Sequence, residues 1–232
     1  SDQSTEEIEQ LFGSEVESIL RGLRKVNQFS DKKNAVESEN YIKLLLSIAE
    51  DIRVVFIMIA QQLQRMRDAK ESEPSRRLDL AVESTYLYAP LAHRLGLYTI
   101  KSELEDLSLK YTDREQYDFI AHKLNETKRS RDRYISEFIG PVKERLDKTG
   151  LKYDIKGRTK SIHSIQNKLK KQKIEFENIY DLFAIRVILD ASPEQEKAQC
   201  WQVYSIITDM YQPNPKRLKD WLSIPKSNGY ES

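Results

Sequence analysis

The sequence predicts an α+β protein in which an all-helical first part precedes a second part of mixed helix and strand. Only 7 of its 232 residues are glycine and 7 are proline, which favours long helices over a many-turned β fold. Apolar residues recur at intervals of three and four before residue 147, whereas a period-two alternation follows Gly150. We therefore place a boundary near residue 150.

Five helical segments are expected in the first part, at residues 5–23, 40–69, 78–91, 102–111 and 115–147. The second is either one long helix or a bent pair. The third contains Pro90 near its end, which predicts a kink or a stop. The polar stretch at 68–76 is expected to be a loop.

The second part begins with a strand, in which Leu151, Tyr153 and Ile155 alternate with charged residues. A helix is expected over 160–173. The run 182–189 is apolar on both faces, which is typical of a central strand. A helix over 194–210 and a further strand over 221–224 complete the predicted elements.

Composition narrows the functional classes. The chain has 38 basic and 37 acidic residues and a net charge of +1, whereas a protein that coats nucleic acid by bulk charge is usually more basic. We therefore expect no direct nucleic-acid binding, and any anion site must come from a local patch. The single cysteine, Cys200, favours a reducing cytoplasm. No apolar run reaches membrane-spanning length, so no membrane association is expected.

One such patch lies between Ile155 and Ile174, where seven Lys or Arg occur without an acidic residue. On a helix that starts at Lys160, the side chains of Lys160, Ser164, Lys168 and Lys171 fall on one face. An ordinary solvated lysine face is the alternative. Arg158 and Lys160 follow Gly157 at a strand-to-helix junction, and this favours an anion site because helix N-termini attract anions.

Asp181 and Tyr230 are further candidates. Asp181 precedes the apolar strand near the basic patch, so it is a candidate Mg²⁺ ligand, with a turn or capping role as the alternative. Tyr230 follows the turn signal Asn228-Gly229 and is placed to stack on a purine, or else to pack at the domain edge. His93, His122 and His163 lack metal-ligand spacing, which favours structural or surface roles for all three.

Taken together, these segments resemble motifs of the RelA/SpoT homologue family, the bacterial alarmone synthetases and hydrolases. The resemblance covers essentially the whole chain. Residues 89–96 and 103–108 match the family's helical junction, and residues 157–168 match its ATP-binding signature. Residues 179–188 match its metal-binding strand. Residues 217–221 match its basic substrate loop, and residues 225–230 match its guanine-binding segment.

The resemblance implies a helical HD-type domain at 1–112, a helical linker at 113–150 and a nucleotidyltransferase-like synthetase domain with a mixed sheet at 151–232. The implied reaction transfers pyrophosphate from ATP to the 3′-hydroxyl of GDP or GTP, giving AMP and (p)ppGpp in the stringent response. Such a transfer depends on a metal and on cationic clamps that bring two polyanions into line.

The resemblance also implies a role for each matching residue. Asp181 is the Mg²⁺ ligand and the catalytic carboxylate, and Arg158 contacts the adenine. The ATP phosphates are held by Lys160, Ser164 and Lys168. The GDP or GTP acceptor is held by Arg217, Lys219, Lys226, Asn228 and Tyr230, with the tyrosine stacked on guanine.

The chain departs from the family in its helical half. Gln61 stands where the family has a metal-binding aspartate, and a neutral amide is a poor ligand for a hard cation. We therefore expect no pyrophosphohydrolase activity, although the basic loop Arg217-x-Lys219-Asp220 is the version found in bifunctional members. Hydrolysis through ligands that precede Ser1 is a remaining alternative, which Gln61 argues against.

A second departure concerns the end of the sequence. Family members continue past the position of Ser232 with a histidine and a strand that carries an acidic second metal ligand or base. We therefore expect the parent protein to be an enzyme and residues 1–232 alone to be poorly active or inactive. The rival hypothesis is a non-catalytic regulator of alarmone signalling that binds nucleotides without turnover.

Overall fold

The computed structural model describes residues 5–30, 47, 51–216 and 218–224. The chain forms two compact units, which we call unit 1 and unit 2. Unit 1 contains Ser1–His122 and Ser161–Phe176, and unit 2 contains Lys123–Lys160 and Glu177–Ser232. The fold class is α+β, as predicted. The predicted domains at 1–112, 113–150 and 151–232 stay a prediction, because packing units and family domains divide a chain by different criteria.

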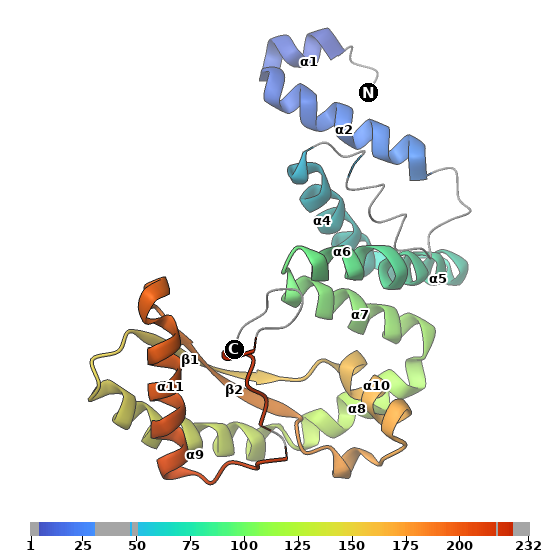
Figure 1. Cartoon of the computed structure of the whole chain (residues 1–232). Coiled ribbons are helices and arrows are strands. Elements are labelled where there is room, and N and C mark those ends of the chain that lie inside the picture. The colour runs from blue at the N-terminus through green and yellow to red at the C-terminus, as the bar shows by residue number, and fades with distance from the viewer. Residues whose placement is uncertain (1–4, 31–46, 48–50, 217, 225–232) are drawn as a thin grey trace. The chain divides into compact units, whose positions relative to one another are not determined.

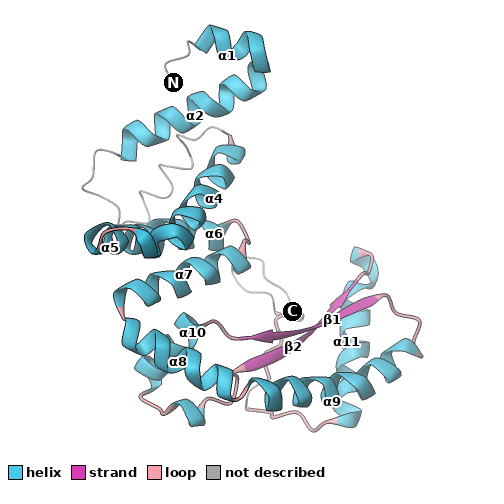
Figure 2. Cartoon of the chain, turned by 180° about the vertical axis from the view of Figure 1, so that it is seen from behind, coloured by secondary structure: helices cyan, strands magenta, loops and turns pink. Residues whose placement is uncertain are grey.

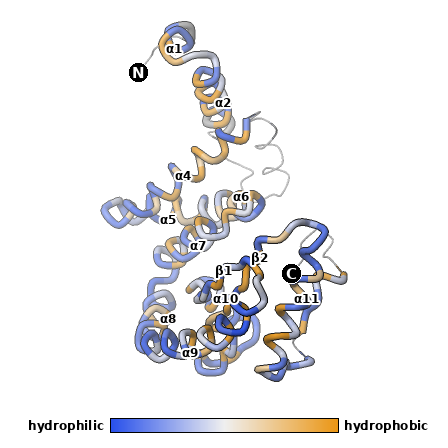
Figure 3. The backbone as a smooth tube through the Cα atoms, turned by 90° about the vertical axis from the view of Figure 1, so that its left-hand side faces the viewer, coloured by the Kyte–Doolittle hydropathy of each residue, from blue (hydrophilic) through white to orange (hydrophobic). Residues whose placement is uncertain are grey.

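Unit 1 is helical (Figure 1). Its described α-helices are α1 (Thr5–Phe12), α2 (Ser14–Ser30), α4 (Ile52–Asp68), α5 (Pro74–Glu83), α6 (Ala89–Arg94), α7 (Tyr98–Thr112), most of α8 (Arg114–Glu126), and α10 (Ile162–Gln172). The main core contains Ile59 of α4, Leu91 of α6 and Leu104 of α7, all with no exposed surface. The first half of α4 lies on the hydrophobic side of the colour scale in Figure 3, as expected of a helix that supplies much of this core.

The helix predicted over 5–23 is interrupted. Gly13 separates α1 from α2 and has a φ of +85°, a conformation that glycine adopts at little cost. Its amide donates to the Glu9 carbonyl at 2.8 Å and so closes the last turn of α1, and its positive φ then ends the helix. Of the helix predicted over 40–69, α4 matches the end, and Asp51 caps it by accepting from the Arg53 amide. The part at 40–46 and 48–50 lies outside the described residues.

The structure limits both proline predictions in this region: the loop predicted over 68–76 is confined to residues 69–73, and the stop predicted at Pro90 is absent, whereas the kink predicted there stays a prediction. Pro74 begins α5 instead of marking a loop, because a proline in the first helical turn loses no intrahelical hydrogen bond. Before Pro90 the chain makes a π-helical turn, Ser84–Tyr88, and then continues as α6 to Arg94. The Ala89 amide reaches back to the Ser84 carbonyl in this wider turn. The helical path therefore passes Pro90 without stopping.

Unit 2 packs helices on a pair of strands (Figure 2). Strands β1 (Tyr153–Thr159) and β2 (Phe183–Leu189) are antiparallel, in a register from Tyr153↔Leu189 to Thr159↔Phe183. Helices α9 (Lys128–Asp147) and α11 (Pro193–Met210) cover their apolar face. The helix predicted over 115–147 is thus two helices, α8 and α9, which meet at Thr127. The shared core contains Val142, Leu146, Val203, Ile155 and Val187.

Two strand predictions are also wrong. Within the described ranges β2 pairs only with β1, and its burial alternates, with Ile188 43% exposed, so it is not a strand buried on both faces. The strand predicted over 221–224 is a turn. The Asp220 carboxylate accepts from the Leu222 and Ser223 amides at 3.0 and 2.8 Å, and this side-chain turn replaces strand pairing.

Two short 3₁₀ segments connect these elements, Ala69–Glu71 after α4 and Phe176–Asn178 before β2. None of the described helices combines the length and the apolar character needed to cross a lipid bilayer.

Candidate functional site

Lys160 and Asp181 meet where the strand pair ends. Lys160 directly follows β1, and its amide donates to the Leu182 carbonyl at 2.8 Å, which extends the pairing by one step. The Lys160 ammonium then donates to Asp181 Oδ2 at 2.8 Å. Their side chains are 28% and 45% exposed, so the pair is open to solvent and to a ligand. The structure therefore brings together a predicted phosphate ligand and the predicted Mg²⁺ ligand.

The donors near Asp181 suit a metal that arrives with a nucleotide. Among the described residues, no group of three or more His, Cys, Asp or Glu side chains is arranged to hold a metal ion. Mg²⁺ needs no such cage, because it keeps several waters and binds through one or two carboxylates plus substrate phosphates. Asp181 fits that mode of binding, and in the structure its charge is balanced by Lys160.

Arg158 lies on the exposed face of the strands. It is the residue opposite Ala184, and side chains alternate along a strand, so Arg158 faces away from the core that contains Ile155. Arg186 of β2 is the diagonal neighbour of Arg158 on the same face, and Lys156 lies directly opposite Arg186. The sequence analysis missed Arg186, although its period-two offset within the apolar run 182–189 marks it as facing outward.

Gly157 is required for packing on the opposite face. A Cβ atom at this position would lie 3.1 Å from Cγ2 of Ile135, a residue of α9. The neighbouring Tyr134 ring meets Phe183 of β2 edge to face, with 5.6 Å between centroids. Gly157 thus lets α9 approach the strand directly behind Arg158.

The residues predicted to bind ATP and its metal ion are divided between the two units. Arg158, Lys160 and Asp181 belong to unit 2, whereas Ser164 and Lys168 belong to unit 1. Helix α10 begins at Ile162, not at Lys160, because the Ser161 hydroxyl caps it by accepting from the Ser164 amide at 3.3 Å. The helical face predicted to include Lys160 therefore begins at Ser164, whose hydroxyl lies 2.7 Å from that of Ser161.

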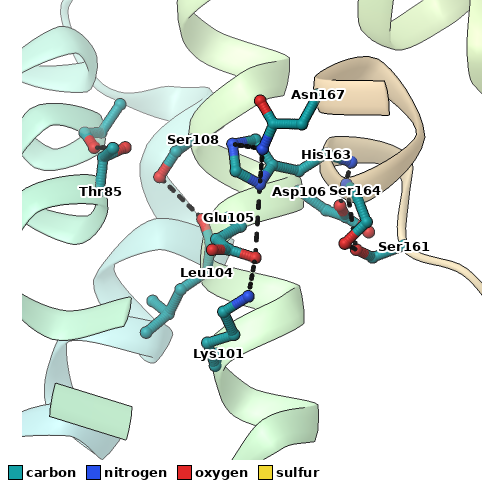
Figure 4. A network of polar contacts seen from close by, with 11 residues as sticks. Thr85, Lys101, Leu104, Glu105, Asp106, Ser108, Ser161, His163, Ser164 and Asn167 are labelled. Carbon is teal, nitrogen blue, oxygen red and sulfur yellow. Dashed lines mark hydrogen bonds and ion pairs between the residues drawn. The ribbon is translucent and has the colours of Figure 1, made fainter. Parts of the chain in front are cut away.

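The N-terminus of α10 already has an anion. Asp106 of α7 accepts from the His163 amide at 2.8 Å (Figure 4). Burial raises the pKa of Asp106, and hydrogen bonds from the His163 and Ile162 amides oppose that rise. A carboxylate of the protein thus occupies the His163 amide at this helix end, and the anion site predicted at Arg158 and Lys160 stays a prediction. Asp106 lies within residues 103–108, which resemble the family's helical junction. The sequence does not show that this segment lies against α10.

Of the predicted acceptor ligands, only Lys219 is described. Arg217, Lys226, Asn228 and Tyr230 lie outside the described residues. Lys219 lines a small pocket with residues of α11, including Trp201 and Tyr204, whose rings meet edge to face at 5.5 Å. Burial raises the pKa of the Cys200 thiol in the same pocket. An apolar, aromatic surface therefore lies beside this predicted ligand of the GDP or GTP acceptor.

In the helical half, Gln61 is exposed on α4. Its neighbour Gln62 is fully buried and donates to the Leu80 carbonyl at 3.2 Å and to the Ser84 hydroxyl at 3.1 Å. Gln62 thus ties α4 to α5 and to the π-helical turn that follows it. The expected loss of hydrolysis at Gln61 stays a prediction.

Two families of known proteins match this chain. The family described as HD domain matches residues 1–98, and the family described as region found in RelA/SpoT proteins matches residues 157–232. The first match covers helices up to the start of α7. The second begins at Gly157, within β1, and includes Lys160, α10 and Asp181.

Individual relatives match the chain from end to end. It is 36% identical over 231 residues to a GTP pyrophosphokinase of Myxococcus xanthus, covering 98% of this chain and 30% of the relative. It is 34% identical over 229 residues to the bifunctional (p)ppGpp synthase/hydrolase SpoT of Escherichia coli, covering 98% and 32%. A guanosine-3′,5′-bis(diphosphate) 3′-pyrophosphohydrolase of Aquifex aeolicus is 34% identical over 233 residues, covering 100% and 32%.

The chain spans about a third of the length of these curated relatives. Both family matches fall in the order that the motifs predict, and the relatives align through both of them. The chain therefore belongs to the RelA/SpoT homologue family of (p)ppGpp synthetases and hydrolases.

Proposed function

We propose that the protein is a (p)ppGpp synthetase that transfers pyrophosphate from ATP to the 3′-hydroxyl of GDP or GTP. The observation that carries this proposal is the contact between Lys160 and Asp181 at the end of the strand pair. In this contact a lysine that would bind phosphate lies next to a carboxylate that would bind a metal ion. The outward-facing Arg158 lies on the adjoining strand. The relative named GTP pyrophosphokinase supports the same assignment.

In this reaction the acceptor's 3′-oxygen attacks the β-phosphorus of ATP, and the bond from that phosphorus to the α–β bridging oxygen breaks. AMP leaves, and the proton of the 3′-hydroxyl is released. Asp181 would hold Mg²⁺, which when bound neutralises charge on the phosphates. Lys160, which pairs with Asp181 in the structure, would hold the ATP phosphates, and the ion pair places both groups at the same end of the strand pair.

The remaining ATP contacts come from two sets of residues. Ser164 and Lys168 would hold phosphates, and Arg158 would contact the adenine. Arg186 would join Arg158 at the base, because planar guanidinium groups stack well on aromatic rings. Lys219, with Arg217, Lys226, Asn228 and Tyr230, would hold the GDP or GTP acceptor. These substrates, together with the single Cys200, suit a cytoplasmic enzyme of the stringent response.

The direct test supplies the protein with radiolabelled ATP, Mg²⁺ and either GDP or GTP, and measures labelled (p)ppGpp. Asp181→Asn removes the charge that would bind the metal, so we expect product formation to be abolished. Asp154→Asn is the matched control, since Asp154 is an exposed carboxylate of β1 that pairs with Lys156 at 2.8 Å. Full activity in the Asp181 variant would remove this residue from the metal site.

A non-catalytic regulator that binds nucleotides is the second candidate. It is favoured by the same ion pair, because Lys160 neutralises Asp181 in the structure and leaves the site suited to anions without a metal. The two functions differ in one measurement. If the protein is a regulator, the wild type binds ATP or (p)ppGpp but forms no labelled product at any Mg²⁺ concentration.

We propose that the helical half does not hydrolyse (p)ppGpp and serves a structural or regulatory role. Gln61 supplies no negative charge where the family has a metal-binding aspartate. The relatives named pyrophosphohydrolases leave hydrolysis as the competing assignment for this half.

A further inference from the structure

Two adjacent acids of α7 hold the first turn of α10 (Figure 4). The Asp106 carboxylate accepts from the His163 amide at 2.8 Å. His163 is the second residue of α10. A partly buried carboxylate that accepts an amide at a helix N-terminus combines a charge-assisted hydrogen bond with the favourable end of the helix dipole. The start of α10 is therefore fixed on α7.

Glu105 holds the same turn through a side chain. Its carboxylate lies 3.4 Å from Nδ1 of His163 and 2.8 Å from Nζ of Lys101, and it is only 13% exposed. The Asn167 amide group, one turn further along α10, approaches the His163 ring at 3.3 Å. His163 is thus held by α7 through its backbone and through its ring, which restricts rotation of α10 as well as translation.

The far half of α10 has its own anchor. Asp113, at the end of α7, accepts from Nε2 of Gln166 at 3.3 Å and lies 3.6 Å from Nζ of Lys170. Between the two anchors Ile165 is fully buried. Ser164 and Lys168, the two predicted ATP-phosphate ligands on this helix, therefore stand on a segment whose position is determined by acids of α7 and its end.

The occupied amides define how α10 can serve a nucleotide. Asp106 accepts from the His163 amide, and the Ser161 hydroxyl accepts from the Ser164 amide. The contribution of α10 to ATP binding would then come mainly from side chains such as Ser164 and Lys168. Side-chain contacts depend on where the helix lies, and displacements of about 1 Å are enough to weaken them.

We propose that Asp106, assisted by Glu105, is a positioning residue for ATP binding, which it serves by fixing α10 on α7. This inference rests on the proposed synthetase function. It also gives α7, which lies between the regions matched by the two families, a direct physical influence on the affinity for ATP. Asp106 itself touches no substrate in this account.

The test compares three variants of the protein. Asp106→Ala removes both carboxylate oxygens. Asp106→Asn keeps one oxygen that can accept a hydrogen bond but removes the negative charge. Glu103→Ala is the matched control, because Glu103 also lies on α7 but pairs with Arg67 of α4 at 2.6 Å. For each protein the Michaelis constants for ATP and for GDP are measured, together with hydrogen exchange of the α10 amides.

Asp106→Ala is expected to raise the KM for ATP about tenfold, leave the KM for GDP unchanged, and speed exchange at the start of α10. Asp106→Asn is expected to show a smaller shift, of about two- to threefold, since it retains one hydrogen bond. Glu103→Ala is expected to leave both constants unchanged. If the alanine variant does not fold, the asparagine variant alone decides, and an unchanged KM for ATP there overturns the inference.

The other outcomes are equally decisive. Faster exchange in α10 with an unchanged KM for ATP, or equal losses for ATP and GDP, overturns the positioning role while the synthetase function stands. Tighter ATP binding in Asp106→Ala also overturns it, since the carboxylate would then compete with phosphate for the amides. A wild-type protein that forms no (p)ppGpp overturns the proposed function and, with it, the inference.

Discussion

Lys160 Nζ lies 2.8 Å from Asp181 Oδ2, so the predicted phosphate ligand neutralises the predicted metal ligand. The contact lies just beyond the register step Thr159↔Phe183 and is fixed by strand pairing. A lysine in this position competes with a cation for the carboxylate. We therefore expect metal binding and phosphate binding by this pair to be coupled, because a metal on Asp181 would release Lys160 and a phosphate on Lys160 would release Asp181.

Lys160→Ala should separate these two effects. Loss of the phosphate contact should lower kcat/KM for ATP by about 10²-fold or more. The Mg²⁺ concentration for half-maximal activity should fall, because Lys160 no longer competes with the metal for the Asp181 carboxylate. Lys156→Ala is the control, since Lys156 pairs with Asp154 at the same 2.8 Å on an exposed strand. An unchanged Mg²⁺ requirement in the Lys160 variant would contradict the coupling.

Arg186→Ala should weaken ATP binding about tenfold with little effect on GDP, because Arg186 shares the exposed strand face with Arg158. Arg186→Lys should not restore the affinity, since an ammonium group keeps the charge but has no plane to stack. Isothermal titration with each nucleotide measures both constants. Rescue by lysine would mean that charge alone matters at this position.

Gly157→Ala should destabilise the protein by about 1–3 kcal/mol, because the new Cβ would lie 3.1 Å from Ile135 Cγ2. In an Ile135→Ala background the same change should cost much less. Gly140→Ala is the control, since a Cβ there meets no atom within 4 Å and alanine favours the interior of α9. Chemical denaturation measures the free energies of unfolding, and equal costs in both backgrounds would rule out the clash.

The ion pair between Glu103 and Arg67 should make stability depend on pH in the acid range. The Arg67 side chain, through its hydrogen bonds, lowers the pKa of Glu103 from its usual 4.5. The contribution is therefore fully present above that value and is lost as the pH falls through the lowered pKa. The stability difference between wild type and Glu103→Gln should be small at pH 7, because both side chains are exposed to solvent that screens the pair, and should vanish in strong acid. A difference that grows towards low pH would reverse this assignment.

Purified (p)ppGpp incubated with the protein and Mn²⁺ should release no pyrophosphate, because Gln61 carries no charge for a metal. Release is measured by chromatography of the nucleotide products. The SpoT relative of Escherichia coli, named as a bifunctional enzyme, is the positive control. Steady turnover by this protein would show that its helical half is a working hydrolase.

The sequence predicted the helical first part, the first strand and the helix over 194–210 well, because each has a clear period and a flanking turn signal. It missed the breaks at Gly13 and Thr127, where apolar periodicity continues across a short interruption. The π-helical turn before Pro90 could not be predicted either. Proline has no amide hydrogen to donate, and only the structure shows that a wider turn allows the helix to continue past it.

The candidate site was predicted in part, for a physical reason. Asp181 and Lys160 were recognised by residue type. Their ion pair depends on the register of the two strands, which cannot be derived from the sequence. Asp106 lies 57 positions from His163 in the chain, so no local pattern connects them. Arg186 was hidden within an apolar run that was interpreted as buried on both sides.

The chain passes between the two units after His122, after Lys160 and after Phe176, so unit 1 is built from two separate stretches of sequence. Helix α10 buries Ile165 within unit 1, although it lies beyond the boundary predicted at residue 150. A protein expressed from Gly150 onward would therefore carry α10 without the helices that cover its apolar side. Recombinant dissection of this family member into autonomous halves would have to keep residues 161–176 together with the N-terminal helices.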